Sequence, residues 1–224
     1  MEPSGPVPLL SGMRNIDLRT DRGSQCNEHE CAMSLNLLPG AVPEHVALVH
    51  PDGIALRRAR TADAEALARA VRESRDHLLP WMPWAANDDS CDPTFQATRL
   101  RDGEASWRRG DEFNYLIVDS AAQRVLGACG LMTRRGPRTL EIGYWSHVAS
   151  AGRGHARTAA AALTAIARRV PGVDEVFIIC DAANKRSAAI PHALGYVLRG
   201  IAPRLITAPG EAGQEMTWVM AGGG

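Results

Sequence analysis

The 224-residue sequence has no net charge, few cysteines and no long apolar run. Its 25 basic residues balance its 25 acidic residues, so no overall field attracts the chain to nucleic acid or to an anionic membrane. No apolar stretch approaches the roughly 20 residues that span a bilayer. The first residues also lack the basic start and apolar core of a signal peptide. We therefore expect a cytoplasmic protein without a nucleic-acid or membrane partner.

The five cysteines are scattered and odd in number. This distribution favours reduced thiols over a disulfide framework, as expected in a cytoplasm. The segment "CNEHEC" carries three metal-binding side chains, those of Cys26, His29 and Cys31. A zinc site normally has a second ligand pair at suitable spacing, and none follows nearby. We therefore expect no metal.

The chain is predicted to contain one globular domain behind a leader. Residues 1–40 alternate proline, glycine and charge without a sustained period, which is typical of a flexible segment. Residues 41–224 are enough to bury a hydrophobic core. We expect them to form a single domain.

The order of apolar segments predicts a mixed α/β domain. Two apolar stretches flank Pro51-Asp52-Gly53, which is a hairpin signal, and Thr61 is expected to cap the helix that follows. Turn signals separate the later strands and indicate an antiparallel meander. Beyond the hairpin, strands are expected at 112–119, 124–132, 138–146, 174–180, 196–201 and 215–220, and helices near 61–71, 93–107, 153–170 and 184–194.

The stretch "SAGRGHARTAAAAL" (150–163) places a glycine turn between a strand and a helix. Unpaired N–H groups at a helix N-terminus point outward and favour anions. Gly152 and Gly154 let the backbone approach a bulky anion, and Arg153 and Arg157 supply charge from one face. A diphosphate fits this arrangement.

A P-loop, a dinucleotide-binding turn and a turn without a ligand are the other interpretations of this segment. A P-loop would need Gly-x-x-x-x-Gly-Lys-Ser/Thr, which is absent. A dinucleotide-binding turn is closer, because Gly152-x-Gly154 follows a strand and Asp181 ends the next one. Its third glycine would fall at Arg157, which argues against it. A glycine turn that opens a helix without any ligand stays open.

The turn "AGRGHA" resembles the acyl-CoA diphosphate loop of the GNAT acetyltransferases, Gln/Arg-x-x-Gly-x-Gly/Ala. Gly154 and Ala156 match the last two fixed positions, whereas Ala151 departs from the first. That departure removes one side chain and leaves the backbone N–H groups in place.

Longer segments resemble the RimJ/RimL branch of that family, which acetylates N-termini of ribosomal proteins. "EIGYW" (141–145) is similar to its fourth strand, and "NKRSAAIPHALGY" (184–196) to its Asn-x-Arg-Ser segment. Residues 56–84 resemble its first strand, first helix and Pro-Trp loop. The resemblance covers about residues 54–220 and leaves the leader unexplained.

The resemblance implies a GNAT fold, in which six to seven mostly antiparallel strands splay between the fourth and fifth and about four helices flank the sheet. It implies an N-acetyltransferase that uses acetyl-CoA, with succinyl-CoA or another acyl-CoA as the alternative donor. The acceptor would be a primary amine, either a protein N-terminus or a small molecule such as an antibiotic. A homodimer is compatible with this prediction.

The same resemblance implies a set of cofactor contacts. The cofactor arm would enter between the splayed strands, and the backbone near His147 and Val148 would pair with it and supply an oxyanion donor. Residues 152–157 would hold the diphosphate, and the amide of Asn184 would hold the pantetheine arm. The predicted cofactor-binding residues are His147, Val148, Gly152, Arg153, Gly154, His155, Ala156, Arg157 and Asn184.

Glu141 is the first candidate for the catalytic base, because the family often places a glutamate on the fourth strand that acts through water. A solvated strand carboxylate is the alternative interpretation. Glu112 and Asp111 are weaker candidates. His147 and His155 could titrate near neutrality, although a lone loop histidine is more often merely exposed.

Ser187 is the candidate acid. Many GNAT enzymes use a tyrosine at the position that Pro191 occupies here, whereas the RimL-like branch has a serine at the position of Ser187. A helix N-terminal serine that bonds to backbone is the alternative interpretation. Trp81, Trp84 and Tyr144 are the predicted substrate-binding residues, although the two tryptophans could instead pin their loop to the core.

Two further functions stay open at this point. One is a nicotinamide-dinucleotide-binding domain. The other is a regulatory module that binds acyl-CoA without turnover, which the missing tyrosine allows. We therefore predict an acyl-CoA-dependent N-acyltransferase and keep these two as alternatives.

Overall fold

The structure, a computed structural model, describes residues 39–223. Nearly all of the predicted leader lies outside the described residues. The Cys26, His29 and Cys31 group lies outside them too.

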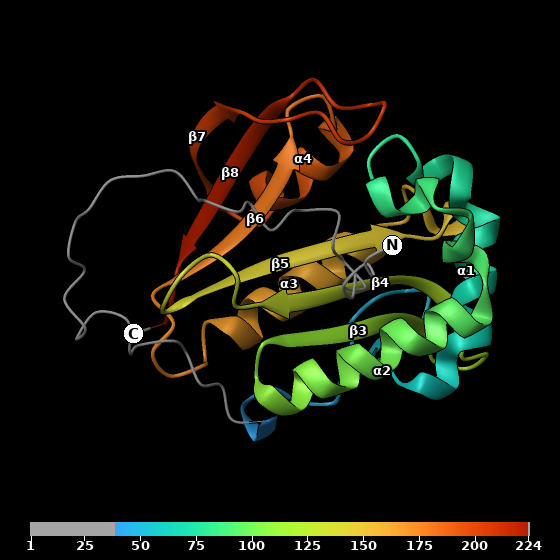
Figure 1. Ribbon diagram of the computed structural model, residues 1–224. Helices are drawn as coiled ribbons and strands as arrows, with labels where there is room; N and C mark the ends of the chain where they lie inside the picture. The colour runs from blue at the N-terminus through green and yellow to red at the C-terminus, as the bar shows by residue number, and fades with distance from the viewer. Residues whose placement is uncertain (1–38, 224) are drawn as a thin grey trace, which may run out of the picture.

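An eight-stranded mixed sheet forms the centre of the molecule (Figure 1). Its spatial order is β1-β2-β3-β4-β5-β6-β8-β7, and neighbours are antiparallel except for the parallel pair β5 and β6. The predicted fold class is confirmed, but the count of six to seven strands was low, because a three-residue β1 pairs with β2 at the edge. The strands are β1 (His45–Ala47), β2 (Ile54–Arg58), β3 (Glu112–Asp119), β4 (Val125–Met132), β5 (Thr139–Ser146), β6 (Glu175–Asp181), β7 (Val197–Pro203) and β8 (Gln214–Ala221).

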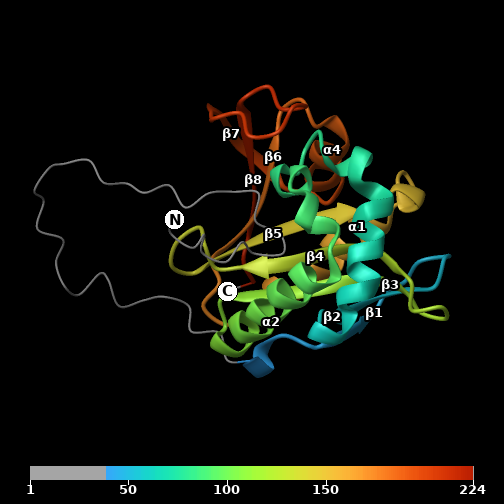
Figure 2. The ribbon, with the colours of Figure 1, turned by 45° about the vertical axis from the view of Figure 1, so that its right-hand side comes forward.

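Helices cover both faces of this sheet. Figure 2 shows α1 and α2 on one face, and Figure 1 shows α3 behind the strands. The fourth helix contacts β6 and β7. The helices are α1 (Ala64–Leu78), α2 (Pro93–Arg109), α3 (His155–Ala167) and α4 (Lys185–Ala193). Among residues 39–223, no helix combines the length and apolarity that a bilayer crossing requires.

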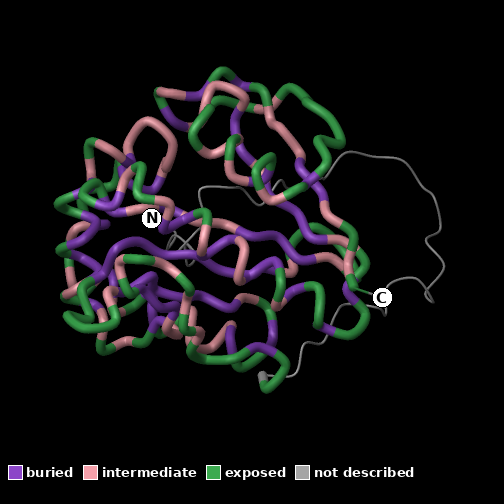
Figure 3. The backbone as a smooth tube through the Cα atoms, turned by 180° about the vertical axis from the view of Figure 1, so that it is seen from behind, coloured by how far each residue is buried: buried purple, intermediate pink, exposed green. Residues whose placement is uncertain are grey.

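Two hydrophobic clusters lie on opposite faces of the central strands. Because side chains alternate along a strand, Phe113 and Tyr115 of β3 join the cluster that contains α3, whereas Leu116 and Val118 join the cluster under α1. Every residue of β4 is buried, and Figure 3 shows the central strands as the most continuously buried part of the backbone. These strands therefore form a rigid support for the loops at their ends.

The start of α1 differs from the sequence-based expectation. Thr61 begins a short 3-10 turn, Thr61–Asp63, and its N–H and hydroxyl both donate to Glu104 of α2. The N-cap of α1 is Asp63. The prediction that Thr61 caps the helix was wrong, because a long-range acceptor takes the hydroxyl.

The sheet opens between its two parallel strands. Register pairing joins Thr139–Ile142 of β5 to Glu175–Ile178 of β6 and then stops, although both strands continue. In Figure 1, β6 leaves β5 at an angle beyond this point. Parallel strands place their carboxyl ends on one side, where ligands of such sheets bind. The glycine turn after β5 and the start of α4 after β6 therefore face the same opening.

Candidate active site

The glycine turn adopts a conformation that suits glycine. Gly152 and Gly154 have φ values of 78° and 84°, in the left-handed region that costs a residue with Cβ free energy. Gly154 is the N-cap of α3 and leaves the first helical N–H groups without a side-chain cap. The first N–H groups of a helix are favourable positions for an anion.

A cavity of about 950 Å³ lies at the opening between β5 and β6. Its wall includes the whole turn from Ser150 to Arg157, and therefore every residue predicted to hold the diphosphate. Trp81, Tyr144, Asn184 and Ser187 line it as well. This volume lies at the upper end of the usual range for small-molecule sites.

His147 and Val148 do not line this cavity. The N–H of His147 donates to the carbonyl of Leu126 on β4 (2.9 Å), and the N–H of Val148 donates to Ser74 Oγ (3.0 Å). Their N–H groups are therefore already paired with β4 and α1, whereas their carbonyl groups accept the N–H groups of Ser150 and Ala151 at the start of the turn.

The backbone groups on the unpaired edge of β5 come from other residues. Because backbone groups alternate between the two edges of a strand, and His147 faces β4, the backbone groups of Tyr144 and Ser146 face the splayed side. Both residues line the cavity. The sequence analysis did not identify their backbone groups as facing the opening, although two-residue alternation anchored on the β4 pairing would have identified them.

Tyr144, Asn184 and Ser187 meet where the two strands separate. Asn184 Oδ1 accepts the N–H of Ser187 (3.1 Å) and so caps α4. Tyr144 donates its hydroxyl to the Ser187 carbonyl (3.2 Å) and lies 3.4 Å from Ser187 Oγ. Burial raises the pKa of Tyr144, so the phenol stays protonated at neutral pH.

A second cavity, of about 80 Å³, adjoins this junction. It shares Trp81, Met82, Tyr144, Asn184 and Ser187 with the large cavity. Half of its remaining lining residues are charged, namely Arg134, Glu141, Asp181, Arg204 and Glu211. The two cavities therefore share Tyr144 and Ser187 as lining residues.

Glu141 is a buried carboxylate held by two arginines. It is 2% exposed and accepts hydrogen bonds from Arg134 (2.5 Å) and Arg135 (2.7 Å). Burial alone would raise its pKa, but the two guanidinium groups outweigh burial and hold the pKa below its ordinary value. Glu141 is therefore ionised at neutral pH, and it lines the small cavity rather than the large one.

Three of the other base candidates, Glu112, Asp111 and His147, do not line either cavity. Glu112 is hydrogen-bonded to Asn114, and burial raises its pKa. Asp111 pairs with Arg109 at the surface. His147 Nε2 lies 3.0 Å from Glu73, and its Nδ1 accepts the N–H of Ala149. The other histidine, His155, lines the large cavity but is only 2% exposed.

The two tryptophans of the Pro-Trp loop have different environments. Trp81 lines both cavities. Trp84 is 8% exposed, belongs to the cluster under α1 and packs against Trp145 with ring centroids 6.1 Å apart. Trp81 is thus placed to contact a substrate, whereas Trp84 fixes the loop to the core.

The hydrogen bonds of Asp181 argue against a dinucleotide-binding site. Its carboxylate accepts backbone N–H groups from Ala183, Ala212, Gly213 and Gln214. An acidic residue that binds a ribose needs free oxygen lone pairs at the ligand. The carboxylate of Asp181 instead organises the turn before β8.

The chain matches a family model and several known proteins. The family model described as acetyltransferase (GNAT) domain matches residues 54–197. Over 154 residues, the chain is 28% identical to YdaF of Bacillus subtilis, whose name assigns it provisionally to the ribosomal N-acetyltransferases; the match covers 66% of this chain and 79% of YdaF.

Two solved structures share the fold. RimJ of Mycobacterium smegmatis, solved with CoA-disulfide, superposes with a TM-score of 0.72 at 22% identity, over 81% of this chain and 88% of RimJ. The ribosomal-protein-S5-alanine acetyltransferase of Vibrio fischeri gives a TM-score of 0.70 at 20% identity, over 79% of this chain and 96% of that enzyme.

Proposed function

Because this chain belongs to the GNAT acetyltransferase family, we propose that it transfers the acetyl group of acetyl-CoA to the α-amine of a protein N-terminus. The names of YdaF and of the Vibrio fischeri enzyme support an acceptor of this class, since both refer to ribosomal or ribosomal-protein acetylation. The complex of RimJ with CoA-disulfide supports CoA as the carrier. A cytoplasmic location stays a prediction.

The observation that carries this proposal is the meeting of two cavities at Tyr144, Asn184 and Ser187. A transferase must bring a donor and an acceptor to one point from two directions. The large cavity suits the long donor, and the small one, beyond Trp81, suits the end of the acceptor. Acyl transfer would take place at the junction.

The residues of the large cavity fit a CoA ester. A Cβ built on Gly152 meets no atom within 4 Å, so there is open space beside this residue, which lines the large cavity. The N–H groups of residues 152–157 would hold that diphosphate. The backbone of Tyr144 and Ser146 would pair with the amides of the pantetheine arm, and Asn184, at the N-terminus of α4, would hold the arm from the opposite side.

The acceptor class affects how much help the proton transfer needs. A free α-amine has a pKa of about 7.7–8 and a lysine amine about 10.4, so an N-terminus loses its proton more readily. Glu141 would accept a proton through water from the small cavity. Because its pKa is held low, it suits the α-amine better than the lysine amine. Ser187, oriented by Tyr144, would donate to the departing thiolate.

Two measurements test the proposal in sequence. The first is thermal stabilisation by acetyl-CoA, succinyl-CoA, CoA, NAD and ATP, since a ligand at a hundredfold excess over its Kd adds about 2.7 kcal/mol to the free energy of unfolding. We expect shifts with CoA and its esters. A shift with NAD alone would overturn the proposal. A larger shift with succinyl-CoA than with acetyl-CoA would identify succinyl-CoA as the donor instead.

The second measurement is thiol release from acetyl-CoA with two matched peptides. One peptide has a free α-amine and no lysine, and the other has an acetylated N-terminus and one lysine. We expect turnover with the first only. Turnover with a small amine but neither peptide would assign a small-molecule acceptor, and CoA binding without turnover on any amine would indicate a regulatory module.

A further inference from the structure

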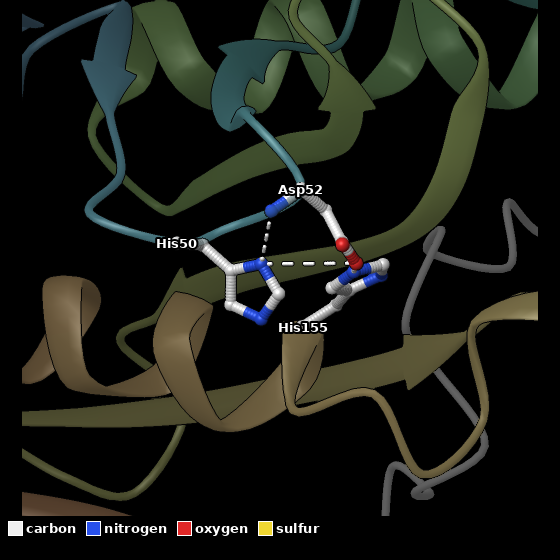
Figure 4. Close-up of side chains that lie close together, drawn as sticks. All are labelled: His50, Asp52 and His155. Atoms are coloured by element: carbon white, nitrogen blue, oxygen red, sulfur yellow. Dashed lines mark hydrogen bonds and ion pairs between the residues drawn. The ribbon is translucent and has the colours of Figure 1, made fainter.

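The turn between β1 and β2 contacts the outer side of the glycine turn. Figure 4 shows His50 and Asp52 of this turn beside His155 at the start of α3. Asp52 lies 2.6 Å from His155 Nε2 and 2.9 Å from the guanidinium of Arg153. His50 Nε2 lies 3.0 Å from the carbonyl of Arg153. A segment about 100 residues earlier in the sequence thus supports the turn that faces the large cavity.

The hydrogen bonds of His50 define its tautomer. The backbone N–H of Asp52 donates to His50 Nδ1 (3.1 Å), so Nδ1 must carry a lone pair. The proton of the neutral ring then lies on Nε2, which donates to the Arg153 carbonyl. Both ring nitrogens have defined and complementary roles.

This contact fixes one peptide plane of the turn. In a trans peptide, the carbonyl of one residue and the N–H of the next point in opposite directions, and the described residues contain no cis bond. Because the Arg153 carbonyl points toward His50, the N–H of Gly154 points away from the β1–β2 turn. Gly154 lines the large cavity, so its N–H is directed to that side.

We propose that His50 is a positioning residue for acyl-CoA: by donating to the Arg153 carbonyl, it holds the Gly154 N–H toward the diphosphate. The proposal rests on the proposed function, since it assumes that a CoA diphosphate occupies the turn. Asp52 completes the support, because its N–H sets the tautomer of His50 and its carboxylate holds Arg153 and His155.

A metal ion at His50, Asp52 and His155 is the competing interpretation, since their ligand atoms lie within 4.8 Å of one another. The surroundings disfavour a cation. Coordination through His50 would break one of its two hydrogen bonds. The ion would also lie beside the Arg153 guanidinium and at the positive end of α3, where anions are favoured.

Two substitutions of His50 test the proposal. In His50→Gln the amide NH₂ can reach the position of Nε2, whereas in His50→Asn the shorter side chain reaches only the position of Nδ1. A charge-assisted hydrogen bond to phosphate is worth about tenfold in affinity. We expect His50→Asn to raise the KM for acetyl-CoA about tenfold at unchanged kcat. His50→Gln should have a KM close to that of the wild type. His45→Ala, an exposed histidine of β1, is the control.

A donor without a diphosphate separates positioning from general damage. With S-acetylpantetheine, wild type and both His50 variants should have equal kcat/KM. An equal loss with both donors, or an unchanged KM for acetyl-CoA in His50→Asn, would overturn the proposal. Zinc that raises the Tm of wild type but not of His50→Gln would also overturn it, in favour of a metal site. If wild type itself binds no CoA, the proposed function fails instead.

Discussion

At the scale of single residues, the neighbours of a side chain decide its chemistry more than its type does. Glu141 and Asp181 are both carboxylates at the small cavity. Two guanidinium groups hold Glu141, and four backbone N–H groups hold Asp181. Glu141 is therefore part of an ion-pair cluster, whereas Asp181 organises the turn before β8.

Glu141→Gln is expected to destabilise the protein by about 3 kcal/mol at pH 7. It removes a buried carboxylate from two arginines, and such losses cost about 3–5 kcal/mol. We expect the lower end, because the arginines are about one quarter to one third exposed and can be hydrated. Urea unfolding of variant and wild type at pH 7 gives the difference.

The pH dependence of that difference follows from the direction of the pKa shift. Since the folded-state pKa of Glu141 lies below the ordinary 4.5, its contribution is complete above about pH 4.5 and is lost as the pH falls through the folded-state value. The difference should be constant from pH 7 to pH 5 and shrink in more acidic buffers. A difference that persists unchanged at pH 3 would refute the assignment. Glu175→Gln, at an exposed ion pair with Arg199, should cost less than 1 kcal/mol.

Gly154→Ala tests whether the turn needs glycine for its conformation. A Cβ there would meet His50 Nε2 at 3.7 Å, which is an ordinary contact, so space is sufficient. The φ of 84° is the obstacle, and an alanine in this region costs about 1–2 kcal/mol. We expect that loss in the free energy of unfolding, together with weaker CoA binding measured by calorimetry.

Gly103→Ala supplies the matched control for this substitution. Gly103 lies inside α2, and its added Cβ would approach only Asn114 Nδ2 at 3.5 Å. Because alanine is favoured over glycine inside a helix, this variant should gain about 0.5–1 kcal/mol. Equal stabilities of the two variants would show that the conformation of the turn is not constrained as described.

At the scale of elements, α4 contains a proline whose missing donor is replaced from another strand. Pro191 has no N–H, so the Ser187 carbonyl, four residues earlier, loses its helical hydrogen bond. The Tyr144 hydroxyl of β5 donates to that carbonyl instead. Pro191 stands where many GNAT enzymes have a tyrosine. Because it leaves the Ser187 carbonyl without a helical donor, that carbonyl can accept from Tyr144 and so position Tyr144 beside Ser187.

Tyr144→Phe and Pro191→Ala should therefore be coupled. In wild type, Tyr144→Phe leaves the Ser187 carbonyl without its donor, at a cost of about 1–2 kcal/mol. In the Pro191→Ala background, the new N–H can satisfy that carbonyl within the helix, and Tyr144→Phe should cost less. A double-mutant cycle by chemical denaturation should give a coupling above about 0.5 kcal/mol. Additive costs would mean that the hydroxyl contributes elsewhere.

At the scale of the whole molecule, the sheet has two parts that meet along a short seam. Strands β1–β5 form one part and β6–β8 the other, and the seam is the four-residue register between β5 and β6. A second contact crosses the opening, where Gly210 of the β7–β8 loop donates to the carbonyl of Pro80, beside Trp81. Residues next to both links, Ile142, Trp81 and Glu211, line the small cavity, and the large cavity adjoins it.

The sequence allowed prediction of features that are encoded locally. The glycine turn, the helix near 184–194 and the strand periods are set by neighbouring residues, so the turn and α4 were placed correctly. The capping of α4 by Asn184 was not predicted. Which backbone groups of β5 face the cavity depends on which strand pairs with β5. A motif around His147 and Val148 does not contain this information. His50 acts on Arg153 from 103 positions away and has no local signal.

Binding of acetyl-CoA is expected to stiffen both parts of the sheet together. The ligand would contact residues 150–157 and the β5 edge on one side and the start of α4 on the other. It would therefore add a link between the two parts of the sheet. Hydrogen exchange with saturating acetyl-CoA should therefore slow not only in the turn but also in β6, α4 and β8. NAD at the same concentration serves as the control and should protect none of these segments. Protection confined to residues 150–157 would mean that the ligand binds the turn without bridging the opening, and the donor would then lie outside the junction of Tyr144 and Ser187.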